Sequence, residues 1–186
     1  MIPPGVCETT PIIATLATNG SAAPSAPSVT GSSNGKSPEQ TPAAPYSPLW
    51  HYPYTQTREA LERLAAEGAS SPFDGVIMEY TNPVTGGPAM PTIGCYVQLL
   101  RPGEHTQAHR HTSSVAFHII EGSGYSIVDG QRLDWEDKDV FCVPGWAFHE
   151  HINTGKQPAI LFSHTDVPVM RSLDLYREEA HPAGQQ

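Results

Sequence analysis

Short strand-forming segments separated by turn signals fill the chain from residue 92 to residue 165. Apolar and β-branched residues predominate in these segments, and glycine, proline, asparagine or aspartate separates each segment from the next. The pair Asp129-Gly130 is typical of the tight turn of a β-hairpin. Many short strands at this spacing predict an all-β barrel or jelly roll. The expected strands are residues 92–101, 109–120 with a break, 125–128, 132–135, 140–143, 148–152 and 159–165.

A helix is expected on each side of this β region. Before it, Thr55 or Thr57 can cap a helix that runs to about Glu67, and one more strand is expected at residues 76–80. After it, Asp166 is expected to cap a closing helix that has a proline in its first turn. The residues expected to face inward from the closing helix are Val169, Leu173 and Tyr176.

Composition divides the 186-residue chain into parts. Residues 1–45 are rich in small residues and proline and contain no aromatic residue, so they cannot bury enough apolar area to offset their ordering entropy. We expect them to be a disordered tail or a linker, and a junction to another domain fits equally well. Residues 46–91 are expected to form an extended arm, a helix and a first strand that pack on the barrel. Residues 92–180 are expected to form the barrel and the C-terminal helix.

The net charge of −9 argues against nucleic acid or an anionic membrane as a partner. No apolar run approaches the length of a membrane span, and the first residues lack the layout of a signal peptide. The cysteines, Cys7, Cys95 and Cys142, are widely spaced and odd in number, which fits a reducing compartment in which Cys95 and Cys142 are buried on strands. The sequence therefore predicts a cytoplasmic protein.

Two histidines stand two residues apart in a segment that is expected to be a strand. Because a strand sends alternate side chains to opposite faces, His109 and His111 should point one way and Arg110 the other. A third histidine, His149, lies on a later expected strand. Three neutral imidazoles can bind one face of a divalent transition metal and leave the opposite face open, as a catalytic site requires. The alternative is a barrel interior that keeps these histidines as hydrogen-bonded polar groups.

The spacing of these residues resembles the two conserved motifs of the cupin superfamily. The first motif is matched by Gly103, His109, His111 and Gly122, and the second by Pro144, His149 and Asn153. The resemblance implies a double-stranded β-helix, the cupin jelly-roll barrel, with a metal held inside it. It also implies that His109, His111 and His149 are the metal ligands.

The chain departs from the cupin pattern at three positions. Val115 stands where cupins usually have a metal-binding glutamate, and Lys138 and Trp146 stand where glycines are expected. Without the glutamate the site has three neutral ligands, so the metal keeps its full positive charge. Such a metal favours an anionic substrate that chelates it across the open positions.

A narrower resemblance covers roughly residues 46–180. The runs 83–95, 100–112, 146–151 and 162–179 are similar to the gentisate 1,2-dioxygenase family, which includes salicylate and 1-hydroxy-2-naphthoate dioxygenases. The resemblance implies Fe(II) on the three histidines, a small aromatic acid chelated through its carboxylate and ortho-hydroxyl, and O2 bound alongside for ring cleavage. It places Gln98 and His151 near the substrate, and it implies a homo-oligomer.

One position favours a different function. In the catalytic cupin of this family an arginine helps to hold the substrate carboxylate, and Phe117 stands at that position here. Members of the family usually carry two cupins, and this sequence resembles the second more than the first. The alternative is therefore a non-catalytic metal-binding or structural cupin, the C-terminal half of a bicupin dioxygenase. The sequence leaves the metal open, because three histidines also accept Zn, Mn, Ni or Cu, and it leaves the aromatic acid open.

Overall fold

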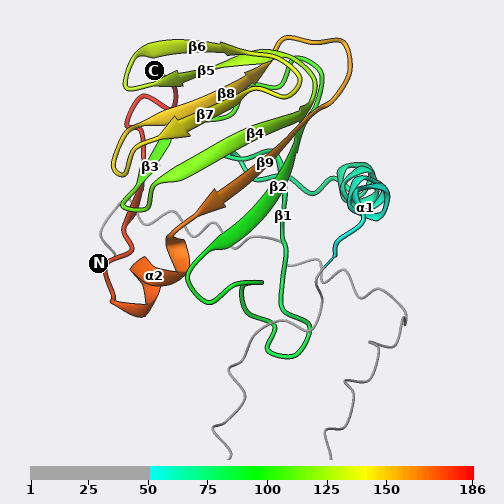
Figure 1. The fold of residues 1–186 in the computed structure, drawn as a ribbon. Helices are drawn as coiled ribbons and strands as arrows, with labels where there is room; N and C mark the ends of the chain where they lie inside the picture. The colour runs from blue at the N-terminus through cyan, green and yellow to red at the C-terminus, as the bar shows by residue number, and fades with distance from the viewer. Residues whose placement is uncertain (1–50) are drawn as a thin grey trace, which may run out of the picture.

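The computed structural model describes residues 51–186, which form two facing antiparallel sheets of five strands each (Figure 1). The first sheet has the strand order β1-β2-β9-β4-β7, and the second sheet has the order β10-β3-β8-β5-β6. The elements are α1 (Tyr54–Ala66), β1 (Val76–Glu79), β2 (Gly94–Leu100), β3 (His109–His111), β4 (Val115–Glu121), β5 (Gly124–Val128), β6 (Gln131–Trp135), β7 (Val140–Val143), β8 (His149–Asn153), β9 (Ala159–Thr165), α2 (Val167–Ser172) and β10 (Glu178–Ala180).

The predicted all-β jelly roll is confirmed, because the chain passes repeatedly from one sheet to the other and few of residues 51–186 are helical. Hairpin neighbours such as β5 and β6 lie together, whereas β4 pairs with the distant strand β9. Asp129 and Gly130 both have positive φ angles, 45° and 75°, as a tight hairpin turn between β5 and β6 requires. The predicted tail, residues 1–45, lies outside the described residues.

The main core lies between the two sheets. On β4 alternate residues are buried, so Val115, Phe117 and Ile119 point into the barrel. They join one apolar cluster with Trp135 of β6 and Leu161 of β9. The cluster fixes the distance between the sheets on which the candidate site depends.

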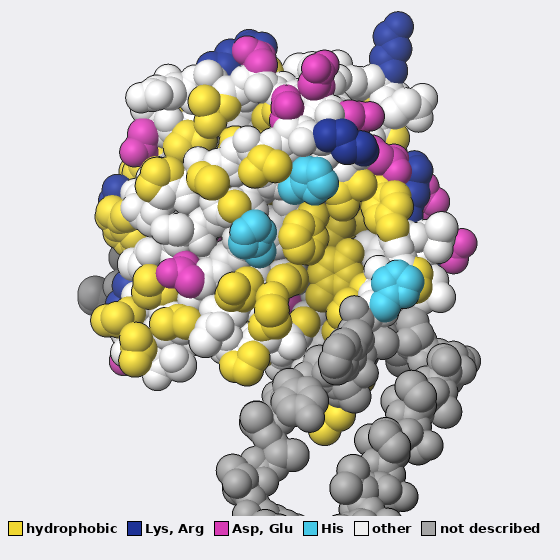
Figure 2. Space-filling view, in the orientation of Figure 1, with side chains coloured by type: hydrophobic (Ala, Val, Ile, Leu, Met, Phe, Trp, Pro, Cys, Tyr) yellow, Lys and Arg dark blue, Asp and Glu magenta, His cyan; other side chains and the backbone are white. Residues whose placement is uncertain are grey.

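A second apolar cluster lies on the outer side of the first sheet. Ala60 and Leu61 of α1 are buried there against residues of β1, β2 and β9 (Val76, Met78, Val97, Leu99 and Ile160). Figure 2 shows apolar side chains gathered on the face that β2, β4 and β9 turn to the viewer, with histidines among them. None of the helices among residues 51–186 is long and apolar enough to cross a membrane.

Asn153, the last residue of the second cupin-like motif, anchors the end of β8. Its Nδ2 atom donates to the carbonyl oxygens of Leu100, Arg101 and Gln157 at 2.9–3.1 Å, and its Oδ1 accepts from the amide of Gly155 at 2.8 Å. The side chain is fully buried. It therefore ties β8, which carries two of the candidate site histidines, to the end of β2 and to the turn before β9.

Both helix caps differ from the prediction. The residue before α1 is Pro53, and no side chain caps that end; the Thr57 hydroxyl instead donates back to the Pro53 carbonyl at 3.3 Å. Asp166 precedes α2 without capping it, because its carboxylate accepts from the amide of Ser114 at 2.9 Å. The helix ends at Ser172, and Leu173 beyond it is 61% exposed, so its predicted inward position is wrong.

Two further residues correct the sequence interpretation. Cys142 was expected to be buried, but it is exposed on β7 because its side chain points away from the barrel, and Cys95 is only half-buried. The short strand β10 has no clear signal in the sequence and forms by pairing with β3.

Two residues that stand where cupins usually have glycine have positive φ angles. Lys138 and Trp146, which stand at the expected glycine positions, have positive φ angles of 77° and 69°. Residues with side chains rarely adopt this left-handed conformation, which glycine adopts readily. Both positions, in the turns before β7 and β8, therefore have a backbone conformation that glycine would favour.

Candidate metal centre

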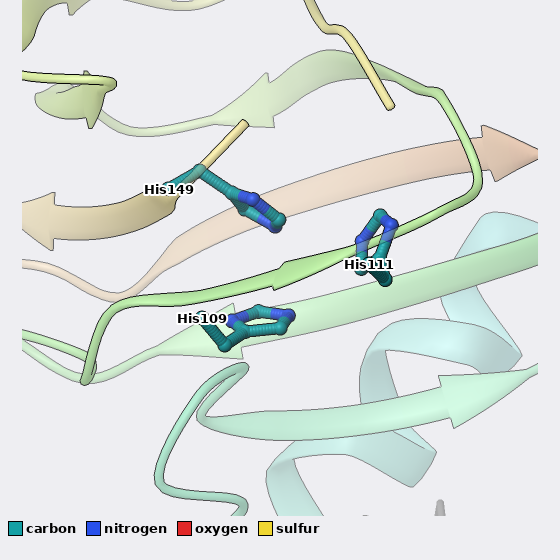
Figure 3. A group of neighbouring side chains, drawn as sticks. All are labelled: His109, His111 and His149. Carbon is teal, nitrogen blue, oxygen red and sulfur yellow. The ribbon is translucent and has the colours of Figure 1, made fainter. Parts of the chain in front are cut away.

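Three histidines from two neighbouring strands of the second sheet converge inside the barrel (Figure 3). His109 and His111 lie on β3, and His149 on β8 is directly opposite His109 in the antiparallel pairing. One ring nitrogen from each residue can be chosen so that all three lie within 4.8 Å of one another. The ring centroids are separated by 4.4–5.5 Å. These separations allow one ion to contact all three rings.

Hydrogen bonds orient two of the three rings. Nδ1 of His111 lies 2.8 Å from the carbonyl oxygen of Ser113, and Nδ1 of His149 lies 3.1 Å from that of Ala147. A carbonyl oxygen only accepts, so both contacts are hydrogen bonds in the tautomer that carries the proton on Nδ1, and the Ser113 hydroxyl, 2.9 Å from Nδ1 of His111, then acts as a second acceptor. In this tautomer each Nε2 has a free lone pair. Such contacts fix the tautomer of metal-binding histidines.

Burial keeps the three imidazoles neutral. It lowers the pKa of His109 and of His149 well below 6.5, and the neighbouring histidines lower both further. Burial also lowers the pKa of His111, although its hydrogen bond to Ser113 acts in the opposite direction. Neutral imidazoles are the form that binds a metal.

The donor set fits a divalent transition metal. Nδ1 of His109 is buried and has no hydrogen-bond partner among residues 51–186. Burying a polar atom without a hydrogen-bond partner costs free energy, unless a bound group from outside the protein interacts with the ring. Three buried neutral imidazoles, one of them unsatisfied, match the ligand set of a metal with open positions.

A pocket opens beside the three histidines, lined by the inner face of the first sheet. Residues that pair across its strands point the same way: Ile77 faces Gln98, and Ser163 on β9 faces Phe117 on β4. All four line the pocket with His109, His111 and His149. A small molecule in the pocket is therefore in reach of a metal on the histidines.

Gln98 contributes an unused donor to this pocket. Its side chain is 2% exposed, and its Nε2 atom has no partner in the described part of the chain. An unpaired buried amide costs free energy, so this group is suited to donate to an oxygen atom of a ligand.

Comparison with known proteins agrees with the fold and the histidine site. Residues 96–165 match the family described as Cupin domain. The chain contains a cupin domain. It is 51% identical over 137 residues to 5-aminosalicylate 1,2-dioxygenase of Comamonas sp., and 39% identical over 132 residues to gentisate 1,2-dioxygenase 1 of Aquipseudomonas alcaligenes. These matches cover 73% and 71% of this chain.

The cupin domain also resembles solved structures. It superposes on salicylate 1,2-dioxygenase from Pseudoaminobacter salicylatoxidans, in its adduct with gentisate, with a TM-score of 0.69 and 30% identity over 75% of this chain. The chain spans only part of these proteins: 36% and 38% of the two curated relatives and 39% of the solved chain. These relatives are named as dioxygenases of aromatic acids. Each is two to three times as long as the segment of this chain that matches it.

His151 lies two residues beyond His149 on β8 and is fully buried. Its Nδ1 atom is 2.8 Å from the hydroxyl of Ser126, which also accepts from the indole of Trp135 at 3.0 Å. The ring packs edge-on against Phe117 at 4.7 Å. Phe117 lines the pocket and His151 does not. His151 therefore sits behind Phe117 when viewed from the pocket.

The pocket lining includes polar residues that the sequence analysis did not connect with the site, among them Asp74, Arg171, Glu178 and Tyr176, of which only Tyr176 was expected to face inward. They come from the loop before β1, from α2 and from the segment that leads into β10. None belongs to a cupin motif. The pairing of β10 with β3 brings Glu178 opposite His111, and the ring of Tyr176 stacks on that of His111 with 6.4 Å between the ring centroids.

Arg110 points out of the barrel, as strand alternation predicts. Its guanidinium lies over the rings of Trp146 and Phe148 and pairs with Glu179 of β10. These contacts hold β3 against β10 from the outside and leave the interior face to the histidines.

Proposed function

We propose that this cupin is an Fe(II)-dependent, ring-cleaving dioxygenase of the gentisate 1,2-dioxygenase type that acts on hydroxy aromatic acids. The observation that carries the proposal is the convergence of three neutral imidazoles beside an open pocket. The names of the relatives support it, because salicylate, 5-aminosalicylate and gentisate are all aromatic acids. The choice of Fe(II) as the metal rests on the resemblance to this family.

The three ligands suit an anionic substrate. Val115 lines the pocket where many cupins have a carboxylate ligand, so the three metal ligands add no negative charge to that of the substrate. A bound Fe(II) would supply a Lewis acid and a one-electron reductant that brings O2 and the aromatic acid together. Gln98 is proposed to donate its unpaired Nε2 hydrogen to a substrate oxygen.

His151 is proposed to act from behind the pocket wall. Its contact with Phe117 and its bond to Ser126 fix the ring that closes the inner end of the pocket. In this role His151 positions Phe117, and Phe117 in turn contacts the substrate.

Phe117 also favours a second candidate, a non-catalytic metal-binding or structural cupin. An apolar ring lines the pocket where catalytic cupins of this family use an arginine. A phenylalanine cannot pair with a carboxylate, so substrate binding would depend on the metal, Gln98 and the remaining pocket residues.

Oxygen uptake separates the two candidates. The full chain is loaded anaerobically with Fe(II) and mixed with gentisate, salicylate, 5-aminosalicylate or 1-hydroxy-2-naphthoate in an oxygen electrode, while the ring absorbance of the acid is followed. We expect equimolar loss of O2 and of the acid with at least one substrate. The variant that carries His109→Ala and His111→Ala is the control and should consume none. No oxygen uptake by the iron-loaded chain with any of the four acids would sink the catalytic proposal.

A further inference from the structure

A buried carboxylate that the proposed function does not use lies next to one of the candidate metal ligands. Glu150 follows His149 on β8, and strand alternation points its side chain away from the pocket, to the outer side of the second sheet. The side chain is nevertheless 0% exposed. A carboxylate removed from solvent is costly unless nearby groups donate to it, so the groups that reach Glu150 indicate its role.

Two segments that are distant in the chain meet at this carboxylate. The backbone amide of Gln186 donates to its two oxygens at 3.3 and 3.4 Å, and Nε2 of His105 lies 3.5 Å from its Oε2. The Gln186 side chain also donates to the carbonyl oxygen of Ile127 on β5 at 3.2 Å. The segment 181–186 therefore crosses the outer side of β8 and β5, and Glu150 binds it directly.

The same segment borders the other strand that carries candidate ligands. β10 pairs with all three residues of β3. The pairing continues past β10, because the amide of His181 donates to the carbonyl oxygen of Ala108 at 2.8 Å and the amide of Ala108 donates to that of Gly184 at 2.7 Å. In the register of the sheet, β3 pairs with β8 at one position, His109 opposite His149. Most of the pairing of β3 is therefore with β10 and the segment that follows it.

We propose that Glu150 is a positioning residue of the metal centre, which acts by holding the segment 181–186 against both ligand strands. The segment pairs with the edge of β3, and Glu150 binds it to β8, so its docking fixes the separation of the strands that carry the three histidines. A metal should then bind more tightly when the segment is docked, and by linkage a bound metal should hold the segment in place. The inference rests on the proposed function only for the presence of a metal on the histidines.

Zinc affinity tests this coupling without turnover. Three histidines accept Zn(II), and competition with a chromophoric chelator measures its dissociation constant in the full chain. We expect Glu150→Ala to weaken zinc binding about tenfold, because the segment is no longer bound to β8. Glu150→Gln keeps an oxygen that accepts from the Gln186 amide, so it should bind zinc within about threefold of the unmodified chain.

A second variant tests the same contact from its other side. Gln186→Pro removes the amide hydrogen that Glu150 accepts, and Gln186 is exposed, so the core stays intact. We expect it to bind zinc about tenfold more weakly than the unmodified chain, and more weakly than Gln186→Ala, which keeps the amide. The control variant is Glu62→Ala, which removes a carboxylate that pairs with Arg58 on the exposed side of α1 and should leave zinc binding unchanged.

Hydrogen exchange gives the reciprocal measurement. Zinc should slow the exchange of the His181 amide about tenfold in the unmodified chain, and it should no longer do so in Glu150→Ala. The amide of Ala69, which donates to the carbonyl oxygen of Leu64 at 3.0 Å at the end of α1, is the internal control and should exchange at the same rate with and without zinc.

Two kinds of result would contradict these expectations. Unchanged zinc affinity in Gln186→Pro or in Glu150→Ala, once circular dichroism shows that the variant is folded, would overturn the positioning role alone. A His181 amide that exchanges at the same rate with and without zinc would do the same. An unmodified chain that binds no zinc would overturn the three-histidine centre, on which the proposed function depends, and the inference with it.

Discussion

Replacing Phe117 with alanine should lower the free energy of unfolding of the metal-free chain by about 3–5 kcal/mol. The ring is 5% exposed, stacks on Phe141 at 5.1 Å and meets His151 edge-on at 4.7 Å. It is also part of the cluster that joins the two sheets. Its loss leaves a cavity between the sheets and removes the wall in front of His151. Urea denaturation at neutral pH measures the change.

The matched control is Phe162→Ala. Phe162 lies on β9 but points to the outer side of the first sheet, where it is half-buried and lies 6.1 Å from the ring of Tyr80. We expect this variant to lose less than half as much stability. A loss at Phe117 no larger than that at Phe162 would mean that Phe117 does not hold the core together.

Replacing Asp74 with asparagine should stabilise the chain at pH 7.5 and have little effect at pH 3.5. The folded-state pKa of Asp74, about 6, lies above its ordinary value of 3.8, so the folded chain binds the proton more tightly than the unfolded chain. The carboxyl therefore stabilises the fold least when it is ionised, and stability is lost as the pH rises from about 3.8 to about 6. The shift of about two pKa units sets an upper limit of ~3 kcal/mol, and solvent around the half-buried group reduces it.

Thermal unfolding at the two pH values tests this expectation. Asparagine keeps an oxygen that accepts from Ser71, so the local hydrogen bond survives the substitution. Ser71→Ala serves as the comparison, since it removes the hydroxyl that stabilises the ionised form and should destabilise the chain at pH 7.5. An Asp74→Asn variant less stable than the unmodified chain at pH 7.5 would contradict the account. A stabilising effect would show that the pocket keeps a carboxylate at a cost in stability, as binding sites often do.

The sequence predicts most of the barrel because its signals are local. Alternation and turn residues marked the strands within one or two residues, and alternation alone placed His109 and His111 on one face of β3. The substitutions Lys138 and Trp146 looked like departures from the cupin pattern, yet their backbone keeps the positive φ of glycine. A motif written in residue types does not record a backbone angle, so the sequence could not show that the turns survive.

The rest of the pocket depends on contacts that are distant in the chain. Glu178 reaches the histidines only because β10 pairs with β3, and three residues of strand give no periodic signal. Strand alternation puts His151 on the same face of β8 as His149, but two residues along a strand span about 7 Å, and His151 packs behind Phe117. Which side chain of one sheet covers a given residue of the other sheet depends on how the two sheets pack. The alternation pattern of a single strand does not contain this information.

Metal content of the purified chain is the most direct test of the three-histidine centre. The chain is loaded anaerobically with Fe(II), freed of excess metal and analysed by elemental mass spectrometry, in parallel with His149→Ala and with the His109→Ala, His111→Ala variant. We predict about one iron per unmodified chain and almost none in either variant, because each variant lacks at least one of the three histidines that converge at the site. An unmodified chain that holds no metal, or variants that hold as much as it does, would contradict the account.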